Sequence, residues 1–227
     1  GKPMTSFQVG QKTVDVFQSE NPNRPVVYLN TYGREGEAVF RQLSAFGDLD
    51  FTLVAISGLN WEHDMVPWDI PSISSKDTPC TGGADAYLEL LLNEILPQAE
   101  ETVLGTPLWR GIAGYSLAGL FALYSIYRTD VFSRAASVSG SLWFPDFPAF
   151  VCSHTPKQTP DCIYFSLGDK EHKTRNPFLQ TVRQNTEDME DFYKQQGLAT
   201  TFQLNPGNHF QDAALRTAAG IRWILNR

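Results

Sequence analysis

The chain has 227 residues and a formal net charge of −7, with 42% hydrophobic and 19% charged residues. These values are typical of a globular protein, and the length predicts one domain spanning 1–227 rather than two. No basic stretch is available to neutralise phosphates, which argues against a nucleic-acid partner. No apolar run approaches the ~20 residues of a membrane-spanning helix, so no membrane partner is expected.

The three cysteines, Cys80, Cys152 and Cys162, are too few for a disulfide framework. We predict that they are reduced, which favours a cytoplasmic location, and we keep a Cys152–Cys162 bridge as the alternative. None of them has metal-ligand spacing to a histidine, so we predict no metal site and no cofactor.

Predicted strands and helices alternate along the chain, each identified from its hydrophobic pattern. In chain order, we predict a half-exposed strand at 12–19, a buried strand at 26–29, a helix at 35–46, a strand at 51–56, a helix at 84–103, a strand ending at Gly114, a helix from Leu117, strands at 134–139 and 162–167, a helix at 177–196, a strand at 200–204 and a helix at 211–225. This alternation predicts a three-layer α/β sandwich with a mainly parallel sheet.

A long irregular stretch, residues 57–83, separates the strand at 51–56 from the next helix. It contains aromatic and titratable side chains, among them Trp61, His63 and Trp68. A loop of this length inside a compact domain usually covers or lines a site. We therefore expect 57–83 to cover the active site.

The stretch Gly114-Tyr-Ser-Leu-Ala118 has the pattern of a nucleophile elbow, in which a serine stands on a sharp turn between a strand and a helix. Such a turn requires small residues two before and two after the serine, because the strand and the helix approach closely. Gly114 and Ala118 occupy these positions around Ser116. The pattern predicts that Ser116 is a nucleophile whose Oγ stands clear at the tip of the sheet.

A serine hydroxyl becomes a good nucleophile when an imidazole accepts its proton and a carboxylate orients that imidazole. Of the four histidines, His209 alone stands in a short glycine-containing turn between a late strand and the last helix. Two acids, Asp169 and Glu171, follow the strand at 162–167. Site residues gather at the carboxyl ends of parallel strands, and serine–acid–histidine is the chain order of the α/β-hydrolase triad. We therefore predict that Ser116, one acid and His209 meet.

The sequence leaves open which acid orients the imidazole. Glu171 is favoured over Asp169, because the acid of such a site commonly lies a few residues beyond a glycine, here Gly168. The alternatives are that both acids are solvated turn residues, or that serine and histidine act as a pair with a weakly engaged acid.

The oxyanion that develops during acyl transfer needs preorganised N–H donors. One donor is expected from the backbone of Leu117, the residue after the serine. The other is expected from the loop after the strand at 26–29, at Tyr32 or Thr31, and Tyr32 is favoured.

Several segments resemble the putative-esterase branch of the α/β-hydrolases, which includes trilactone siderophore esterases, esterase D or S-formylglutathione hydrolase, feruloyl esterases and mycolyl transferases. These segments are Val26–Leu29, Gly82–Tyr87, Gly114–Gly119, Ser139–Trp143, Gly168–Glu171 and Gly207–His209. The Ser-x-Ser-x-Trp segment is most similar to the siderophore-esterase subgroup. The chain departs from that subgroup at Asn30-Thr31, where an Asp-Gly pair is usual, and at 61–68, which replaces an Arg-rich substrate loop.

We accordingly expect a serine esterase that cleaves a small-molecule carboxylic ester, siderophore-type or with a small acyl group, through an acyl-enzyme intermediate. An acyltransferase or an S-formylglutathione-type thioesterase on the same triad is one alternative, and a non-catalytic binding module is another. A homodimer stays open. The side chains expected to bind substrate are Trp61, His63, Trp68, Trp143 and Phe144. The basic cluster Lys170, Lys173 and Arg175 is interpreted as a solvated turn rather than an anion site.

Overall fold

One sheet organises the described part of the chain, residues 4–227 of the computed structural model. Its eight strands stand in the order β1-β2-β4-β3-β5-β6-β7-β8. They are β1 Met4–Val9, β2 Lys12–Phe17, β3 Val26–Asn30, β4 Thr52–Ser57, β5 Arg110–Tyr115, β6 Arg134–Val138, β7 Cys162–Gly168 and β8 Ala199–Asn205. From β4 to β8 all neighbours are parallel, whereas β2 pairs antiparallel with β1 and β4.

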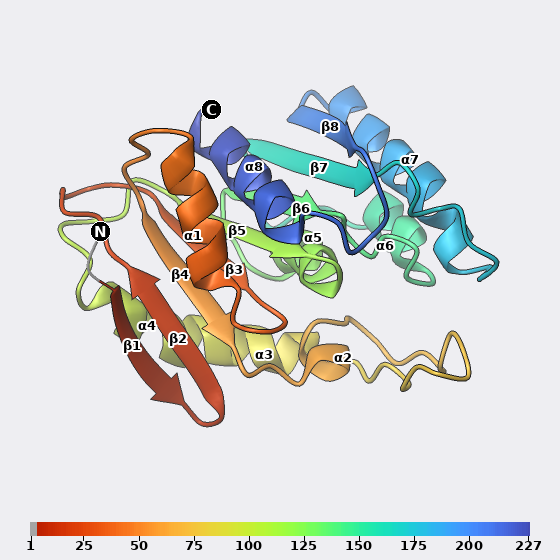
Figure 1. The fold of residues 1–227 in the computed structure, drawn as a ribbon, viewed down its shortest axis with the longest axis horizontal. Helices are drawn as coiled ribbons and strands as arrows, with labels where there is room; N and C mark the ends of the chain where they lie inside the picture. The colour runs from red at the N-terminus through yellow and green to blue at the C-terminus, as the bar shows by residue number, and fades with distance from the viewer. Residues whose placement is uncertain (1–3) are drawn as a thin grey trace.

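Helices cover both faces of this sheet (Figure 1). They are α1 Gly36–Ala45, α2 Trp61–Asp64, α3 Ala84–Leu90, the π-helical turn η1 Leu91–Ile95, α4 Leu96–Glu100, α5 Leu117–Arg128, α6 Phe147–Ser153, the 3-10 turn η2 Leu179–Thr181, α7 Val182–Gln195 and α8 Ala213–Leu225. Val39 and Leu43 of α1 share one buried cluster with Ile221 of α8, whereas Phe121 of α5 and Tyr193 of α7 belong to the cluster on the other face. The predicted three-layer α/β architecture is confirmed.

The first strand, β1, was not predicted from the sequence. It forms a hairpin with β2 through Gly10, whose φ of +60° suits a tight turn. At this edge of the sheet only Phe7 and Val9 of β1 reach the core, and both are partly buried. An edge strand with so little apolar content carries a weak alternation signal.

The helix predicted over 84–103 ends at Glu100 in the structure, and its α-helical hydrogen-bond pattern is interrupted on the way. The π-helical turn η1 interrupts it and ends two residues before Pro97. Proline has no backbone N–H, so the residue four positions earlier loses its helical partner and the ladder is disrupted there. The helix α6 was not predicted either, because its seven residues lie within a proline-containing stretch.

The three cysteines are free thiols, and the alternative Cys152–Cys162 bridge is not formed. Cys162 is buried at the start of β7, whereas Cys152 is exposed on α6. Among the described residues, no helix has both the length and the apolar character that membrane crossing requires.

The contact between β5 and α5 is the closest approach of a strand and a helix around the predicted elbow. A Cβ atom at Gly114 would overlap the backbone carbonyl of Ala118 on the first turn of α5. All residues of α5 from Leu117 to Tyr127 are buried, so the helix cannot move outward to make room. Only glycine fits at position 114 of this strand.

We predict that Gly114→Ala lowers the free energy of unfolding by about 3 kcal/mol, because the added methyl group overpacks a rigid backbone contact. Chemical denaturation followed by circular dichroism measures this change. Ala118→Gly is the matched control, since it removes side-chain volume from the same contact and costs about 1 kcal/mol through helix propensity alone. Equal unfolding midpoints for Gly114→Ala and the wild type would show that the contact is loose.

Candidate active site

Ser116 stands on a strained turn between β5 and α5. Its φ of 64° and ψ of −125° lie outside the regions that non-glycine residues usually adopt, at a cost of about 1–3 kcal/mol. Backbone hydrogen bonds hold the turn: the Ser116 N–H donates to Val138 O at 3.1 Å, and the Ser141 N–H donates to Ser116 O at 3.0 Å. The turn thus presents the Ser116 side chain at the carboxyl edge of the sheet.

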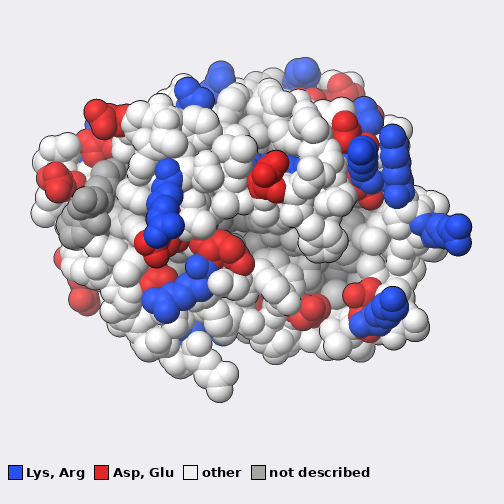
Figure 2. All heavy atoms as spheres, in the orientation of Figure 1, with Lys and Arg blue, Asp and Glu red and all other residues white. Residues whose placement is uncertain are grey.

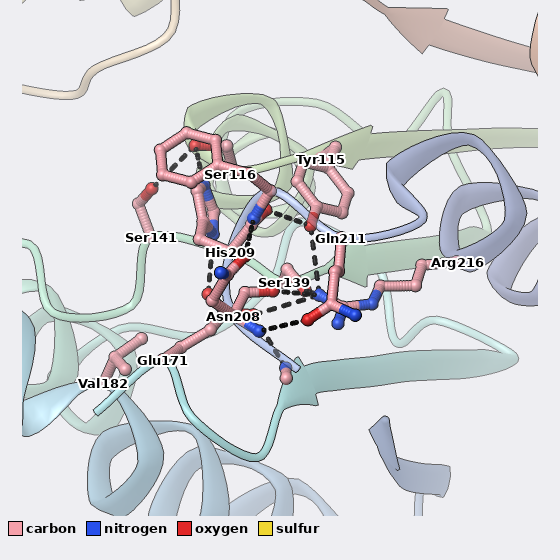
Figure 3. A network of polar contacts seen from close by, with 12 residues as sticks. Tyr115, Ser116, Ser139, Ser141, Glu171, Val182, Asn208, His209, Gln211 and Arg216 are labelled. Atoms are coloured by element: carbon pink, nitrogen blue, oxygen red, sulfur yellow. Dashed lines mark hydrogen bonds and ion pairs between the residues drawn. The ribbon is translucent and has the colours of Figure 1, made fainter. Parts of the chain in front are cut away.

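His209 connects Ser116 to Glu171 by two hydrogen bonds (Figure 3). Its Nε2 lies 2.9 Å from Ser116 Oγ, and its Nδ1 lies 2.6 Å from Glu171 Oε1. The Glu171 side chain is 5% exposed and that of His209 is 29% exposed. The second carboxylate oxygen, Oε2, accepts a hydrogen bond from the Gly168 N–H at 2.7 Å and lies 3.5 Å from Arg216 Nη1. Residues 93 and 38 positions apart along the chain therefore form one polar chain.

Asp169 does not contact the imidazole in this arrangement. Its Oδ1 accepts a hydrogen bond from the Gly207 N–H at 2.9 Å, and its own N–H donates to Asn205 O at 2.7 Å. Asp169 therefore fixes the loop after β8 to the end of β7. From the other side, the Tyr115 hydroxyl donates to the carbonyl of His209 at 2.5 Å. The backbone of the histidine loop is held at both points.

A buried arginine of α8, Arg216, joins the elements that carry the three side chains (Figure 3). It donates to the carbonyls of Asn208 at 2.9 Å and Pro206 at 2.8 Å, both in the loop before His209. Its Nη1 also lies 3.2 Å from the Tyr115 hydroxyl and 3.5 Å from the Glu171 carboxylate. Arg216 was not among the site residues predicted from the sequence. A signal was present, because position 216 falls on the apolar face of α8, where a charged residue needs partners.

The three predicted oxyanion donors differ in what their N–H groups do. Leu117 is the first residue of α5, so its N–H has no helical carbonyl to bind. The Thr31 N–H donates to Ile56 O at 2.8 Å and is therefore used by the sheet. The Tyr32 N–H donates to Glu35 Oε2 at 3.0 Å, so it takes no part in the hydrogen bonding of the sheet. Leu117 and Tyr32 are thus the donors that a ligand can reach without breaking the sheet.

Two cavities meet at Ser116. The larger has a volume of about 420 Å³ and the smaller about 280 Å³. Both are lined by Ser116 and His209 together with the aromatic side chains of Trp61 and Phe210. Within the described chain, no group of three or more His, Cys, Asp or Glu side chains is arranged to hold a metal ion.

The expected substrate-binding residues separate into two groups. Trp61 lines both cavities, and Trp143 lines the smaller one. Trp68 instead packs on Phe144, with a ring-centroid distance of 5.7 Å, and Phe144 is fully buried. His63 Nδ1 lies 2.8 Å from the hydroxyl oxygen of Thr81, within the same loop. These three side chains line neither cavity.

The loop 57–83 contributes both to packing and to the site. It is closed on itself by an antiparallel bridge between Ile70 and Cys80. Its lining residues come from α2 and from the segment around Asp77, whereas its centre is anchored by the Trp68 indole N–H, which donates to Pro145 O at 3.0 Å. Phe210, which is 88% exposed, was not predicted, because a solvent-facing aromatic beside the histidine has no periodicity to identify it.

Comparison with known proteins agrees with the class that this fold and site define, an α/β-hydrolase. The family model described as Putative esterase matches residues 32–214. The chain is 24% identical to the protein named "Uncharacterized protein YbbA" of Bacillus subtilis (strain 168), over 93% of this chain and 89% of that one. The structure of siderophore hydrolase EstA from Aspergillus nidulans has a TM-score of 0.76 at 19% identity, covering 99% of this chain and 95% of that chain. An IroE-like serine hydrolase from Shewanella oneidensis has a TM-score of 0.77 at 17% identity, covering 100% and 80%.

The chain belongs to the Putative esterase family, since the model covers most of its length. It is a carboxylic ester hydrolase with the α/β-hydrolase fold. The structural similarity, at less than 20% identity, establishes the fold of this chain and not its substrate.

We predict that Arg216→Met lowers the free energy of unfolding by about 3 kcal/mol and reduces kcat at least ~10-fold with little change in KM. The reason is that a buried carboxylate and two loop carbonyls lose a charged partner. Thermal or urea unfolding and ester hydrolysis measure the two effects. Arg222→Met, on the exposed face of the same helix, is the control. If Arg216→Met were as stable and active as Arg222→Met, the network would have no role in holding the site.

An ion pair fixes the loop that carries Tyr32 to the sheet. Arg34 of this loop forms two hydrogen bonds to Asp15 of β2, at 2.9 and 3.0 Å. The Arg34 guanidinium holds the pKa of the Asp15 carboxyl below its ordinary value, partly offset by burial. A carboxyl with a depressed folded-state pKa stabilises the fold above the unfolded-state pKa, and this contribution is lost as pH falls through the folded-state value.

Between about pH 4 and pH 2, the wild type should therefore lose more unfolding free energy than Asp15→Asn, which has no carboxyl to protonate at this position. Urea unfolding at a series of pH values tests the difference. Asp48→Asn is the control for removing an acid elsewhere on the chain. Parallel pH profiles for the wild type and Asp15→Asn would contradict the role given to this pair.

Proposed function

We propose that the protein is a serine hydrolase that cleaves small-molecule carboxylic esters through an acyl-enzyme intermediate, with Ser116 as nucleophile, His209 as general base and acid, and Glu171 as the carboxylate that orients His209. The observation that carries the proposal is the pair of hydrogen bonds made by His209, 2.9 Å to Ser116 Oγ and 2.6 Å to Glu171 Oε1. The serine lies at hydrogen-bond distance from a base whose second nitrogen is already fixed.

The reaction has two stages. In the first, His209 Nε2 takes the proton of Ser116 as its Oγ attacks the ester carbonyl, and it then gives that proton to the leaving alcohol. In the second, His209 takes a proton from water, the resulting hydroxide attacks the acyl group on Ser116, and the acid is released as the proton returns to the serine. Glu171 keeps the Nδ1–H directed toward itself and stabilises the imidazolium that forms at each stage.

The negative charge on the carbonyl oxygen is assigned to the N–H groups of Leu117 and Tyr32. The Tyr32 N–H is bonded to the carboxylate of Glu35, so the substrate oxygen replaces that carboxylate as its acceptor. Thr31 is left out of this proposal, because its N–H belongs to the sheet. Asp169 is assigned to holding the loop after β8 rather than to the imidazole.

The substrate class, the cellular location and the domain organisation are also proposals. EstA of Aspergillus nidulans is named a siderophore hydrolase, and a siderophore-type ester or a small acyl ester is proposed for this chain by analogy of fold alone. Transfer of the acyl group to an alcohol acceptor or cleavage of a thioester would use the same three side chains. A location in the cytoplasm is proposed from the three free thiols, and a single domain over 1–227 from the one continuous sheet.

We predict a burst of p-nitrophenol from a p-nitrophenyl ester, with an amplitude of about one per enzyme, because acylation releases the alcohol before water releases the acid. Ser116→Ala and His209→Ala should each lower kcat about 10⁴-fold or more. Stopped-flow absorbance measures the burst, and steady-state kinetics measures kcat.

Glu171→Gln and Asp169→Asn form the matched pair that identifies the acid. We expect the first to reduce kcat by about 10²–10⁴-fold and the second by less than ~10-fold, because only Glu171 bonds to His209. Full activity of Ser116→Ala, or a larger loss in Asp169→Asn than in Glu171→Gln, would contradict the assignment.

A further inference from the structure

The two cavities that meet at Ser116 differ in chemical character. The larger one extends between α1 and α8 and is lined there by aliphatic side chains, Leu29, Val39, Ala213 and Ala214. The one carboxylate among its described lining residues, Glu35, is already bonded to backbone N–H groups. This cavity therefore suits an uncharged, apolar part of a substrate.

Three carboxylates line the smaller cavity, and one of them, Glu171, is bonded to His209. The other two are Glu62, which is half-buried on α2, and Asp77, which is exposed in the loop 57–83. Asp77 accepts a hydrogen bond from the hydroxyl of Ser74 at 2.5 Å, and neither Glu62 nor Asp77 forms an ion pair with another of the residues 4–227. Their charges are thus left to act on whatever enters the cavity.

The thiol of Cys80 is affected by the electrostatic potential in this cavity. Burial, the largest cause, and the negative charges of Glu62 and Asp77 together raise its pKa to about 11. Cys80 lines this cavity together with both acids and with Leu117 of the elbow. A position inside the cavity therefore has a potential that opposes an added negative charge.

No basic side chain offsets this potential from within. None of the described residues that line either cavity is a lysine or an arginine. Arg216 is buried, lies 3.5 Å from the Glu171 carboxylate and lines neither cavity. Lys12 pairs with Asp64 at 3.2 Å, and Arg34 pairs with Asp15. In Figure 2, acidic side chains border the hollow near the centre of the molecule, and most basic side chains stand away from it.

We propose that the substrate is an ester with one apolar part, which fills the cavity between α1 and α8, and one positively charged part, which enters the cavity bordered by Glu62 and Asp77. This inference rests on the proposed function, because it places the scissile bond at Ser116, which lines both cavities. A cleft of one sign raises the local concentration of ligands of the opposite sign and repels those of the same sign. Anionic esters are accordingly poor substrates of this site.

Two series of esters test the proposal, since the charged part can belong to the alcohol or to the acid. The first series consists of three butyryl thioesters. Their thiols are thiocholine, its uncharged isostere with a tert-butyl group in place of trimethylammonium, and mercaptopropionate. The second has p-nitrophenyl esters of a trimethylammonium-bearing acid, of its tert-butyl isostere and of a dicarboxylic acid. Each kcat/KM is divided by the rate of hydroxide-catalysed hydrolysis, which removes differences in intrinsic reactivity.

We expect the cationic ester to exceed its uncharged isostere about tenfold in at least one series, and the anionic ester to fall below it. In the double variant Glu62→Gln/Asp77→Asn the preference for the cationic ester over its isostere should shrink to about threefold or less. Added salt should reduce the wild-type preference in the same direction. Glu89→Gln, an exposed acid of α3 that lines neither cavity, should keep the wild-type preference.

A preference below about threefold in both series, or an anionic ester as the best substrate, would overturn the proposal. So would a preference that survives unchanged in the double variant. These results leave the proposed function standing if Ser116→Ala still abolishes hydrolysis of the uncharged isostere. Hydrolysis that persists in Ser116→Ala, or no hydrolysis of any ester by the wild type, is the separate result that removes both.

Discussion

The close contact between β5 and α5 is the constraint on which the site depends. Gly114 allows the strand to touch the backbone of Ala118, and this proximity forces the chain to reverse direction at Ser116 with a positive φ. A strained serine persists only where the surrounding structure determines its conformation. Here the determining structure is a fully buried helix on one side and the parallel neighbours β3 and β6 on the other.

The other half of the site is assembled by polar contacts rather than by apolar packing. His209 lies in an irregular loop after β8, and its position is set by Asp169, Tyr115 and Arg216, which bind the loop backbone. Buried polar groups of this kind stabilise a single arrangement when every member has a partner. The imidazole can therefore keep its place between Ser116 and Glu171 although 29% of its side chain is exposed.

Much of this arrangement could be predicted from the sequence, because it depends on local signals. Alternating buried strands and helices predicted the α/β fold, and the pattern Gly114-x-Ser116-x-Ala118 predicted the turn at the serine. What the sequence left undecided depends on tertiary contacts. In the sequence, Trp68 and Phe144 are equally compatible with a pocket or with the core. In the structure they pack on each other, and the Trp68 indole N–H donates to the Pro145 carbonyl. Arg216 lies on the apolar face of α8, but its partners, two loop carbonyls, the Tyr115 hydroxyl and the Glu171 carboxylate, come together only in the folded chain.

We propose that the hydroxyl of Ser116, activated by His209, attacks the substrate. The most direct test of this proposal is the reaction of the folded protein with a fluorophosphonate, followed by intact-mass and peptide mass spectrometry. The structure predicts one phosphonyl group per chain on the peptide that contains Ser116, and a rate of modification that falls by orders of magnitude in His209→Ala. Modification of Ser141, whose Oγ lies 3.5 Å from that of Ser116, or no modification at all, would contradict the claim.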